Sequence, residues 1–230
     1  MGEEFVALSL PPMLIGICAA VACALPGNFL LLRRQALIGD AISHVVLPGI
    51  VVAFLVTGII AALPMMLGAG AAALVAVALI EVIRRLGKIE PGAAMGVVFT
   101  AMFAGGVLLL EQSDTSDVHL DVQHALYGNL ESLIWLDAFG WSSLFDWAAL
   151  KGLPPELPRM AATLAFVSGF TWVFWRPLKI SSFDEGFART VGLRTGVLGL
   201  SLVIVAAIAA VAAFDAVGSI IVIAMFICPP

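Results

Sequence analysis

The chain has 230 residues, of which 62% are hydrophobic and 12% are charged, and its mean hydropathy is +1.11. A soluble domain would carry about twice that share of charged residues, so the composition excludes an ordinary soluble domain and indicates a multi-pass α-helical membrane protein. The net charge is −5 and no basic patch is present, which excludes a nucleic-acid-binding protein.

Long apolar runs predict at least six membrane spans and a seventh that begins near the end of the chain. We expect Pro26 to break the first span and Pro48 to bend the second, because a proline leaves a helix carbonyl unpaired. The final apolar run reaches Pro230 without a basic residue to close it, so we expect the last spans to be incomplete. The expected spans cover residues 11–32, 37–57, 64–83, 91–110, 159–175, 197–213 and 219–228.

Residues 111–158 differ from the expected spans. They are polar at first and then contain Trp135, Trp141 and Trp147. Tryptophan favours the membrane–water interface, so we expect short helices on the outer face of the membrane. The expected architecture for residues 1–230 is a single all-α domain, a polytopic transmembrane helical bundle.

The basic residues predict the orientation of the chain. All but Lys151 and Arg159 of the eleven Lys and Arg residues fall in alternate connections between the expected spans. The positive-inside rule places this group in the cytoplasm, so the N-terminus and the Trp-rich segment are expected outside. The group consists of Arg33, Arg34, Arg84, Arg85, Lys88, Arg176, Lys179, Arg189 and Arg194.

Asp40 and His44 stand in the second expected span, at positions i and i+4 of one helix face. Counted from Arg33 and Arg34, His44 lies roughly 15 Å into the membrane, about halfway through a hydrocarbon core ~30 Å thick. Ionisable side chains at that depth mark functional sites. A carboxylate and an imidazole suit Mn²⁺, Fe²⁺ or Zn²⁺, and a two-fold dimer would bring two of each together. The other interpretation is a hydrogen-bonded pair that ties two helices together.

A capping box, Ser-Phe-Asp-Glu over residues 182–185, is predicted within a polar loop over residues 176–195. Its serine would be the N-cap and its glutamate the N3 residue of a short helix that ends near Val191, before Gly192. The apolar side of this helix would either dock on a soluble partner or lie on lipid. That side would carry Phe183, Phe187 and Val191.

Polar residues elsewhere are weaker candidates. Asp121 and His124 belong to a group of Asp and His residues in the outer segment, which either collects metal ions or consists of solvated loop residues and helix caps. Asp215 follows the sixth expected span, where it either caps a turn or lines a permeation path.

Residues 37–49, Leu-Ile-Gly-Asp-Ala-Ile-Ser-His-Val-Val-Leu-Pro-Gly, resemble the signature of the manganese/zinc/iron permease family of ABC importers. The basic pair just before them is similar to that family. So are His-Ala-Leu-Tyr-Gly-Asn-Leu over residues 124–130 and Ser-Phe-Asp-Glu-Gly-Phe-Ala over residues 182–188. Residues 217–230 resemble the family's late helix, and the resemblance extends over residues 13–230. Two departures are a long outer segment after Trp135 and the missing last spans.

The resemblance implies a transport permease rather than an enzyme, with no permanently bound cofactor. The implied cargo is a divalent metal, Mn²⁺ first and Zn²⁺ or Fe²⁺ as alternatives, carried across a bacterial or archaeal cytoplasmic membrane. The implied partners are membrane lipid, two ABC ATPase subunits, an extracytoplasmic metal-binding protein and a second permease copy, identical or different. Asp40 and His44 match the family's metal positions. Coupling to the ATPase is implied for residues 180–194, through Ser182, Phe183, Asp184, Glu185, Phe187, Ala188 and Gly192.

Two other classes compete with this interpretation. An intramembrane metalloenzyme would need a third protein ligand and a general base, and the sequence has no His-Glu-x-x-His motif. A proton-coupled secondary metal transporter would show internal repeats. No clear repeat is present, and the short cytoplasmic helix would then lack a partner.

Overall fold

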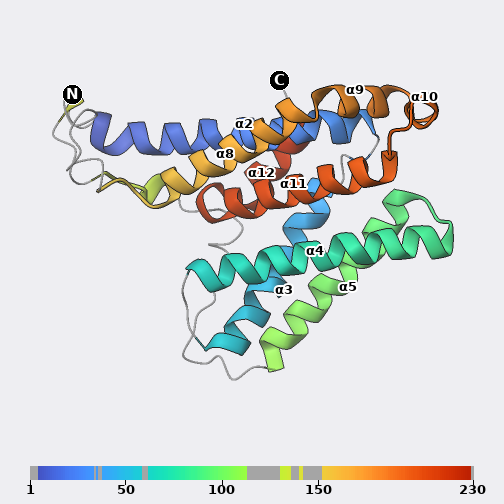
Figure 1. Cartoon of the computed structure of the whole chain (residues 1–230). Coiled ribbons are helices and arrows are strands. Elements are labelled where there is room, and N and C mark those ends of the chain that lie inside the picture. Colours follow the sequence, from blue (N-terminus) through green and yellow to red (C-terminus); the bar gives the residue numbers. More distant parts are fainter. Residues whose placement is uncertain are drawn as a thin grey trace.

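The computed structural model describes residues 5–33, 35, 38–58, 62–112, 130–135, 140–141 and 152–228. The side chains of several helical residues, Asp40 and Asp215 among them, lie outside this description. The described part is a bundle of helices (Figure 1). In chain order its α-helices are α2 (Leu10–Leu32), α3 (Ile38–Thr57), α4 (Ala62–Gly87), α5 (Pro91–Gln112), α8 (Glu156–Val173), α9 (Trp175–Phe183), α10 (Glu185–Thr190), α11 (Thr195–Val217) and α12 (Ser219–Ile227).

These helices coincide with the predicted spans, with two corrections. The break expected at Pro26 is wrong: α2 continues through it, because a proline removes one backbone hydrogen bond and the helices packed on α2 hold the axis. The polar loop expected over residues 176–195 is mostly helical. It forms α9, which buries Leu178 and Ser181, and then α10.

Four helical segments of the described chain are long and apolar enough to cross a membrane. The pair α8 and α9 adds a fifth if it counts as one span, bent by 69° at Phe174. α3 contributes a shorter apolar stretch, His44–Thr57. The predicted fold class is therefore confirmed, although fewer helices meet this test than the six or seven spans expected. The four segments are Phe5–Leu32, Pro64–Arg84, Gly92–Leu109 and Thr195–Phe214.

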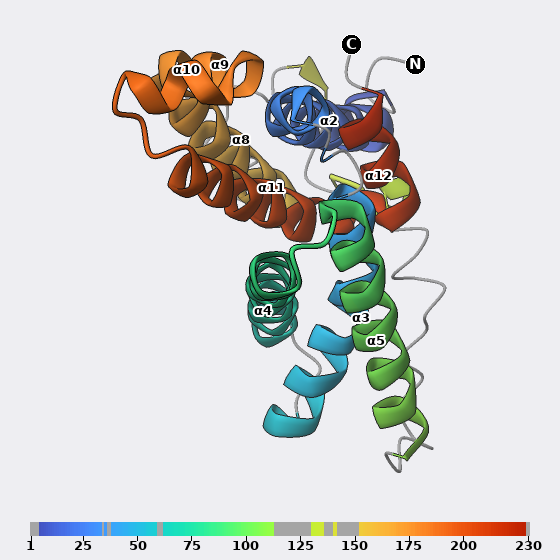
Figure 2. The ribbon, with the colours of Figure 1, turned by 90° about the vertical axis from the view of Figure 1, so that its right-hand side faces the viewer.

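α11 is the central helix of the bundle. It packs on α2 and α8 on one side and on α3 and α4 on the other (Figure 2). Of its apolar segment 61% is buried inside the protein, against 22–28% for the other three segments. Alanine makes this possible, because a helix face of small side chains lets neighbouring helices approach closely. The buried alanines are Ala206, Ala207, Ala209, Ala210, Ala213 and Ala216.

α3 is held tightly between α4 and α5 by contacts that only glycine permits. A Cβ on Gly49 would lie 2.6 Å from the carbonyl oxygen of Gly68 and 2.7 Å from Cα of Ala69, both in α4. A Cβ on Gly106 of α5 would lie 2.6 Å from Cβ of Pro48. Two neighbouring residues of α3 therefore touch two different helices at backbone distance, which fixes α3 one turn beyond His44.

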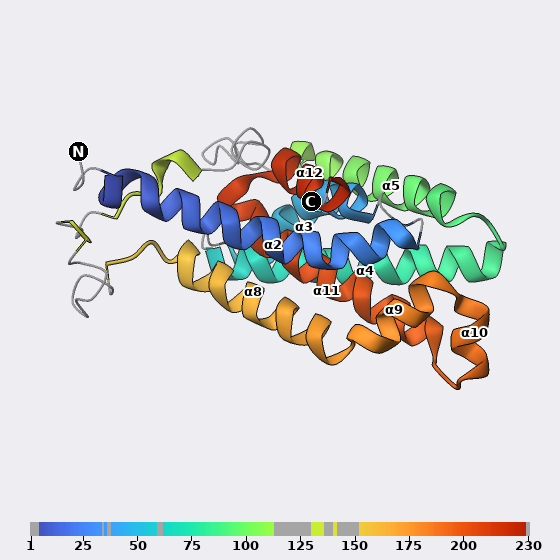
Figure 3. The ribbon, with the colours of Figure 1, turned by 90° about the horizontal axis from the view of Figure 1, so that it is seen from above.

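The predicted grouping of basic residues agrees with the arrangement of the helices. The end of α2, the connection from α4 to α5, and the α9–α10 region lie at one end of the bundle (Figures 1 and 3). These segments include Arg33, Lys88 and Arg189. The described part of the Trp-rich segment lies at the opposite end, where Trp135 is fully buried and its backbone N–H donates to the carbonyl of Ala7 at 2.9 Å.

Candidate functional site

A cavity of about 440 Å³ lies among α2, α3, α4, α5, α9, α10 and α11 at the basic end of the bundle. Its mouth reaches the surface, because the exposed side chains of Leu32 and Phe183 (71%) line it. Its inner end is apolar and lies in the core, where Val45, Ala76 and Val98 are buried. The polar residues that line it are Arg33, Gln35, Glu81, Arg84, Ser181, Ser182, Glu185 and Thr195.

Oxygen atoms at this mouth could interact with a hydrated cation. Glu81 forms an ion pair with Arg84 at 2.8 Å, one turn apart on α4. The Oε1 atom of Gln35 is buried and has no hydrogen-bond partner among the described residues. A buried oxygen without a partner carries a desolvation cost, which water or an ion in the cavity would offset.

His44 lies next to the inner end of this cavity. Its half-buried imidazole stacks on Phe99 of α5, with ring centroids 5.2 Å apart and planes at 21°. It also meets the edge of Phe103, at 5.7 Å and 79°. Phe99 lines the cavity as well, so one aromatic ring touches both His44 and the cavity.

Asp40 stands one turn before His44 on α3, as the spacing predicted. Its side chain lies outside the described residues, and so does that of Asp215 in α11. Asp121 and His124 lie outside the described residues altogether. Among the side chains that are described, no three His, Cys, Asp or Glu residues converge on one point.

The predicted capping box is wrong: Ser182 is not the N-cap, and Glu185 is the first residue of α10 and not its third. Ser182 lies in the last turn of α9, and the backbone becomes extended only at Asp184, with φ −144° and ψ 98°. The Asp184 carboxylate therefore caps α10, accepting a hydrogen bond from the backbone N–H of Phe187 at 2.8 Å. A helix cannot begin at Ser182 because the preceding helix has not yet ended there.

The end of α10 follows the prediction. Gly192 has φ +86° and its N–H donates to the carbonyl of Arg189, while the N–H of Leu193 donates to the carbonyl of Ala188. These two bonds form a Schellman motif, which requires a left-handed residue after the helix. The corner of α9 and α10 exposes three apolar side chains, Phe183 (71%), Phe187 (57%) and Val191 (58%).

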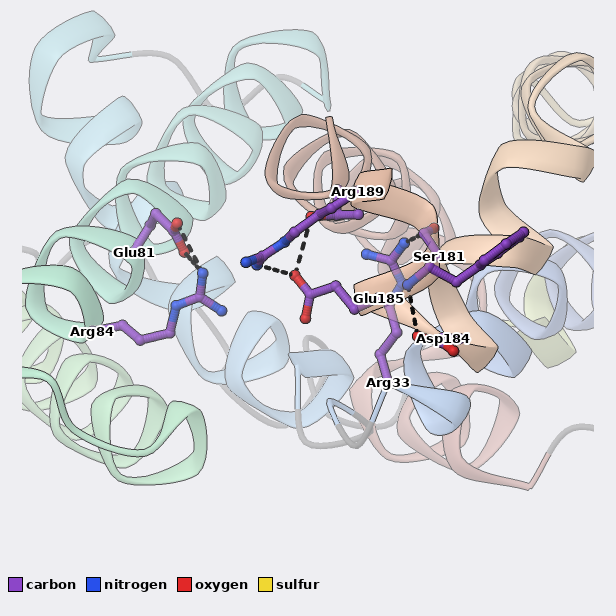
Figure 4. A network of polar contacts seen from close by, with 9 residues as sticks. Arg33, Glu81, Arg84, Ser181, Asp184, Glu185 and Arg189 are labelled. Atoms are coloured by element: carbon purple, nitrogen blue, oxygen red, sulfur yellow. Dashed lines mark hydrogen bonds and ion pairs between the residues drawn. The ribbon is translucent and has the colours of Figure 1, made fainter. Parts of the chain in front are cut away.

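A polar network holds this corner in shape (Figure 4). The Glu185 carboxylate pairs with Arg189 at 2.6 Å and accepts a hydrogen bond from the hydroxyl of Thr195 at 3.1 Å. Hydrogen bonding by Arg189 is the main reason that the pKa of Glu185 is lowered; burial opposes this effect. The network joins α10 to the first residue of α11.

Arg33 connects the corner to the end of α2. Its guanidinium donates to the hydroxyl oxygens of Ser182 at 3.1 Å and Ser181 at 2.5 Å. It also packs on Gly199, where a Cβ would lie 2.8 Å from the guanidinium. Desolvation lowers the pKa of Arg33, and the charge of Glu185 counteracts this. The sequence did not indicate these partners of Arg33, because they are 148 and 149 residues away.

Comparison with known proteins identifies the family. The model of the ABC 3 transport family matches residues 7–137 and 153–230. The chain is 36% identical over 217 residues to the manganese transport system membrane protein MntD of Bacillus subtilis, covering 94% of this chain and 70% of that protein. It is also 36% identical over 222 residues to the zinc transport system membrane protein TroD of Treponema pallidum, covering 96% of this chain and 58% of that protein.

The fold is likewise similar to a solved structure. PsaBC from Streptococcus pneumoniae, determined in complex with Fab, matches with a TM-score of 0.70 and 26% identity, over 98% of this chain and 72% of that chain. The apolar helices, the family match and this structural similarity agree. The chain therefore belongs to the ABC 3 transport family, as a multi-pass membrane permease and not an enzyme.

Proposed function

We propose that this chain is the permease subunit of an ATP-driven importer for a divalent transition metal, with Mn²⁺ as the first candidate. The observation that carries the proposal is the position of His44, half-buried in the bundle beside a cavity that opens at the basic end. Imidazole favours first-row metals over Ca²⁺ and Mg²⁺. Zn²⁺ and Fe²⁺ are the alternatives, because the two relatives named above are manganese and zinc transport proteins and the ligand types suit all three ions.

In this proposal Asp40 and His44 hold the ion during transport. They lie one helical turn apart on α3, and a second permease copy, identical or different, would supply another such pair across a two-fold axis. A shared site of this kind binds the ion without a closed set of ligands in either subunit, so the ion can leave again. Asp121, His124 and Asp215 are weaker candidates, and we propose that they line the route of the metal ion.

The exposed corner of α9 and α10 is proposed to dock on an ATPase subunit. In a complex of two permease copies and two ATPase subunits, each corner would contact one ATPase subunit. The corner offers apolar anchors on a short helix whose geometry is fixed by the Asp184 cap and the Glu185 network. This assigns the basic end to the cytoplasm of a bacterial cell, in the inner membrane. An extracytoplasmic metal-binding protein would then dock at the opposite end, on the side of the N-terminus.

Metal uptake by reconstituted complexes tests this proposal. We expect Asp40→Asn and His44→Ala each to reduce ATP-driven Mn²⁺ uptake by about tenfold or more, because each removes a metal ligand. Glu90→Gln is the matched control, since Glu90 is an exposed acid in the connection between α4 and α5. Uptake close to the wild-type rate in both Asp40→Asn and His44→Ala would reject the site, and competition with Zn²⁺ and Fe²⁺ would identify the preferred ion.

A further inference from the structure

Phe99 occupies a position that the sequence did not indicate. One ring of α5 stacks on His44, with centroids 5.2 Å apart, and also forms part of the wall of the cavity at the basic end. His44 itself is not among the residues that line this cavity. Phe99 therefore contacts both the imidazole and the cavity.

The surroundings of Phe99 form an apolar closure. Val45, Ala76 and Val98 are each at most 3% exposed and form one buried cluster, against which Phe99 packs. All four line the inner end of the cavity. A hydrated divalent cation crosses such an apolar layer only at a high desolvation cost. The layer would therefore keep an ion bound at His44 from reaching the polar mouth of the cavity.

We propose that Phe99 is the inner barrier of the transport route, and that the 440 Å³ cavity is the chamber into which the metal ion is released. This inference rests on the proposed function. Displacement of the Phe99 ring would connect the space around His44 with the cavity. The ion would then reach the mouth, where Arg33 and Arg84 lie beside the carboxylates of Glu81 and Glu185. The Oε1 atom of Gln35, which has no partner among the described residues, also lies there. Each of these carboxylates already pairs with an arginine, so the mouth would pass the ion on to water without holding it tightly.

Phe103 provides a matched control on the same helix. It lies one turn from Phe99 and meets the same imidazole at 5.7 Å, but it does not line the cavity. Truncation of either ring removes the same number of atoms and one contact with His44. Only truncation of Phe99 also opens the wall between His44 and the cavity.

Passive leakage of Mn²⁺ measures the barrier directly. The full permease with its ATPase is reconstituted in sealed liposomes that contain a fluorophore quenched by Mn²⁺, and Mn²⁺ is added outside without ATP. We expect Phe99→Ala to increase the leak rate about tenfold or more, which corresponds to about 1.4 kcal/mol of barrier height. Phe99→Leu, which keeps an apolar side chain of intermediate size, should increase the leak less. Phe103→Ala should leave the leak at the wild-type level.

The outcomes separate the two proposals. A leak from both Phe99→Ala and Phe103→Ala, or from neither, overturns the barrier while leaving ATP-driven uptake by the wild type intact. Absence of ATP-driven uptake by the wild type overturns the proposed function and the barrier together. If Phe99→Ala does not assemble, the Phe99→Leu variant decides: a leak equal to the wild type overturns the barrier, and an increased leak supports it.

Discussion

The helices α3, α4 and α5 and the corner formed by α9 and α10 hold their candidate functional side chains in opposite ways. In the first region, glycine contacts at backbone distance fix α3, and two phenylalanine rings enclose the imidazole of His44. In the second, a carboxylate cap, an ion pair and a threonine hydroxyl fix exposed loops and a short helix. The comparison shows that close packing positions a polar group inside an apolar bundle, whereas hydrogen bonds position apolar groups at an aqueous surface.

The two regions are connected through Arg33. Its guanidinium reaches α9 by two hydrogen bonds and packs on α11, and Arg33 also lines the cavity that α3, α4 and α5 surround. A movement of the corner would therefore reach the mouth of the cavity without passing through the tightly packed part of α3. This arrangement places the rigid region at the metal candidate and the hydrogen-bonded corner at the proposed ATPase contact.

The largest expected effect concerns the rigid region. Gly49→Ala should destabilise the protein by about 3 kcal/mol, because the new Cβ would meet the backbone of α4 at 2.6 and 2.7 Å and the helices must separate. Thermal unfolding in detergent measures the change. Gly70→Ala is the control, since a Cβ there has no neighbour within 4 Å, and it should be close to neutral. Equal stability of both variants would contradict backbone-level packing of α3 on α4.

A smaller effect, on binding rather than stability, is expected at the corner. Phe187→Ala should weaken capture of the ATPase subunit by about tenfold, because truncation of an aromatic anchor is costly at an interface. Thermal stability should change by no more than about 0.5 kcal/mol, since the side chain is 57% exposed. Leu108→Ala, also 57% exposed but on α5, should leave capture unchanged. Reduced capture by both variants would argue against a specific contact at α10.

The smallest expected effect is the pH dependence of the corner. The folded-state pKa of Glu185 is lowered, chiefly by its hydrogen bond with Arg189. The stabilisation is therefore present above the usual carboxyl pKa and is lost as pH falls and the carboxylate becomes protonated. Wild type should be slightly more stable than Glu185→Gln at neutral pH, and the difference should shrink in acid. Thermal unfolding of both proteins across this pH range tests the sign; a difference that grows in acid would contradict it.

The sequence alone was sufficient for the features that depend on local patterns. Apolar runs predicted the helices, the i, i+4 spacing put Asp40 and His44 on α3, and Gly192 marked the end of α10. The distribution of Arg and Lys predicted which helix ends lie together, because charged residues avoid the membrane interior wherever they occur along the chain.

Other features were decided only by tertiary contacts. Ser182 matched a capping box, but α9 continues through it and Arg33 binds its hydroxyl, so Asp184 became the cap. Pro26 stayed within α2 because neighbouring helices support that helix. Phe99 became a candidate barrier only when α5 packed on α3. Periodicity and capping depend on residues a few positions apart, whereas these outcomes depend on helices distant in sequence, whose contacts no local pattern encodes.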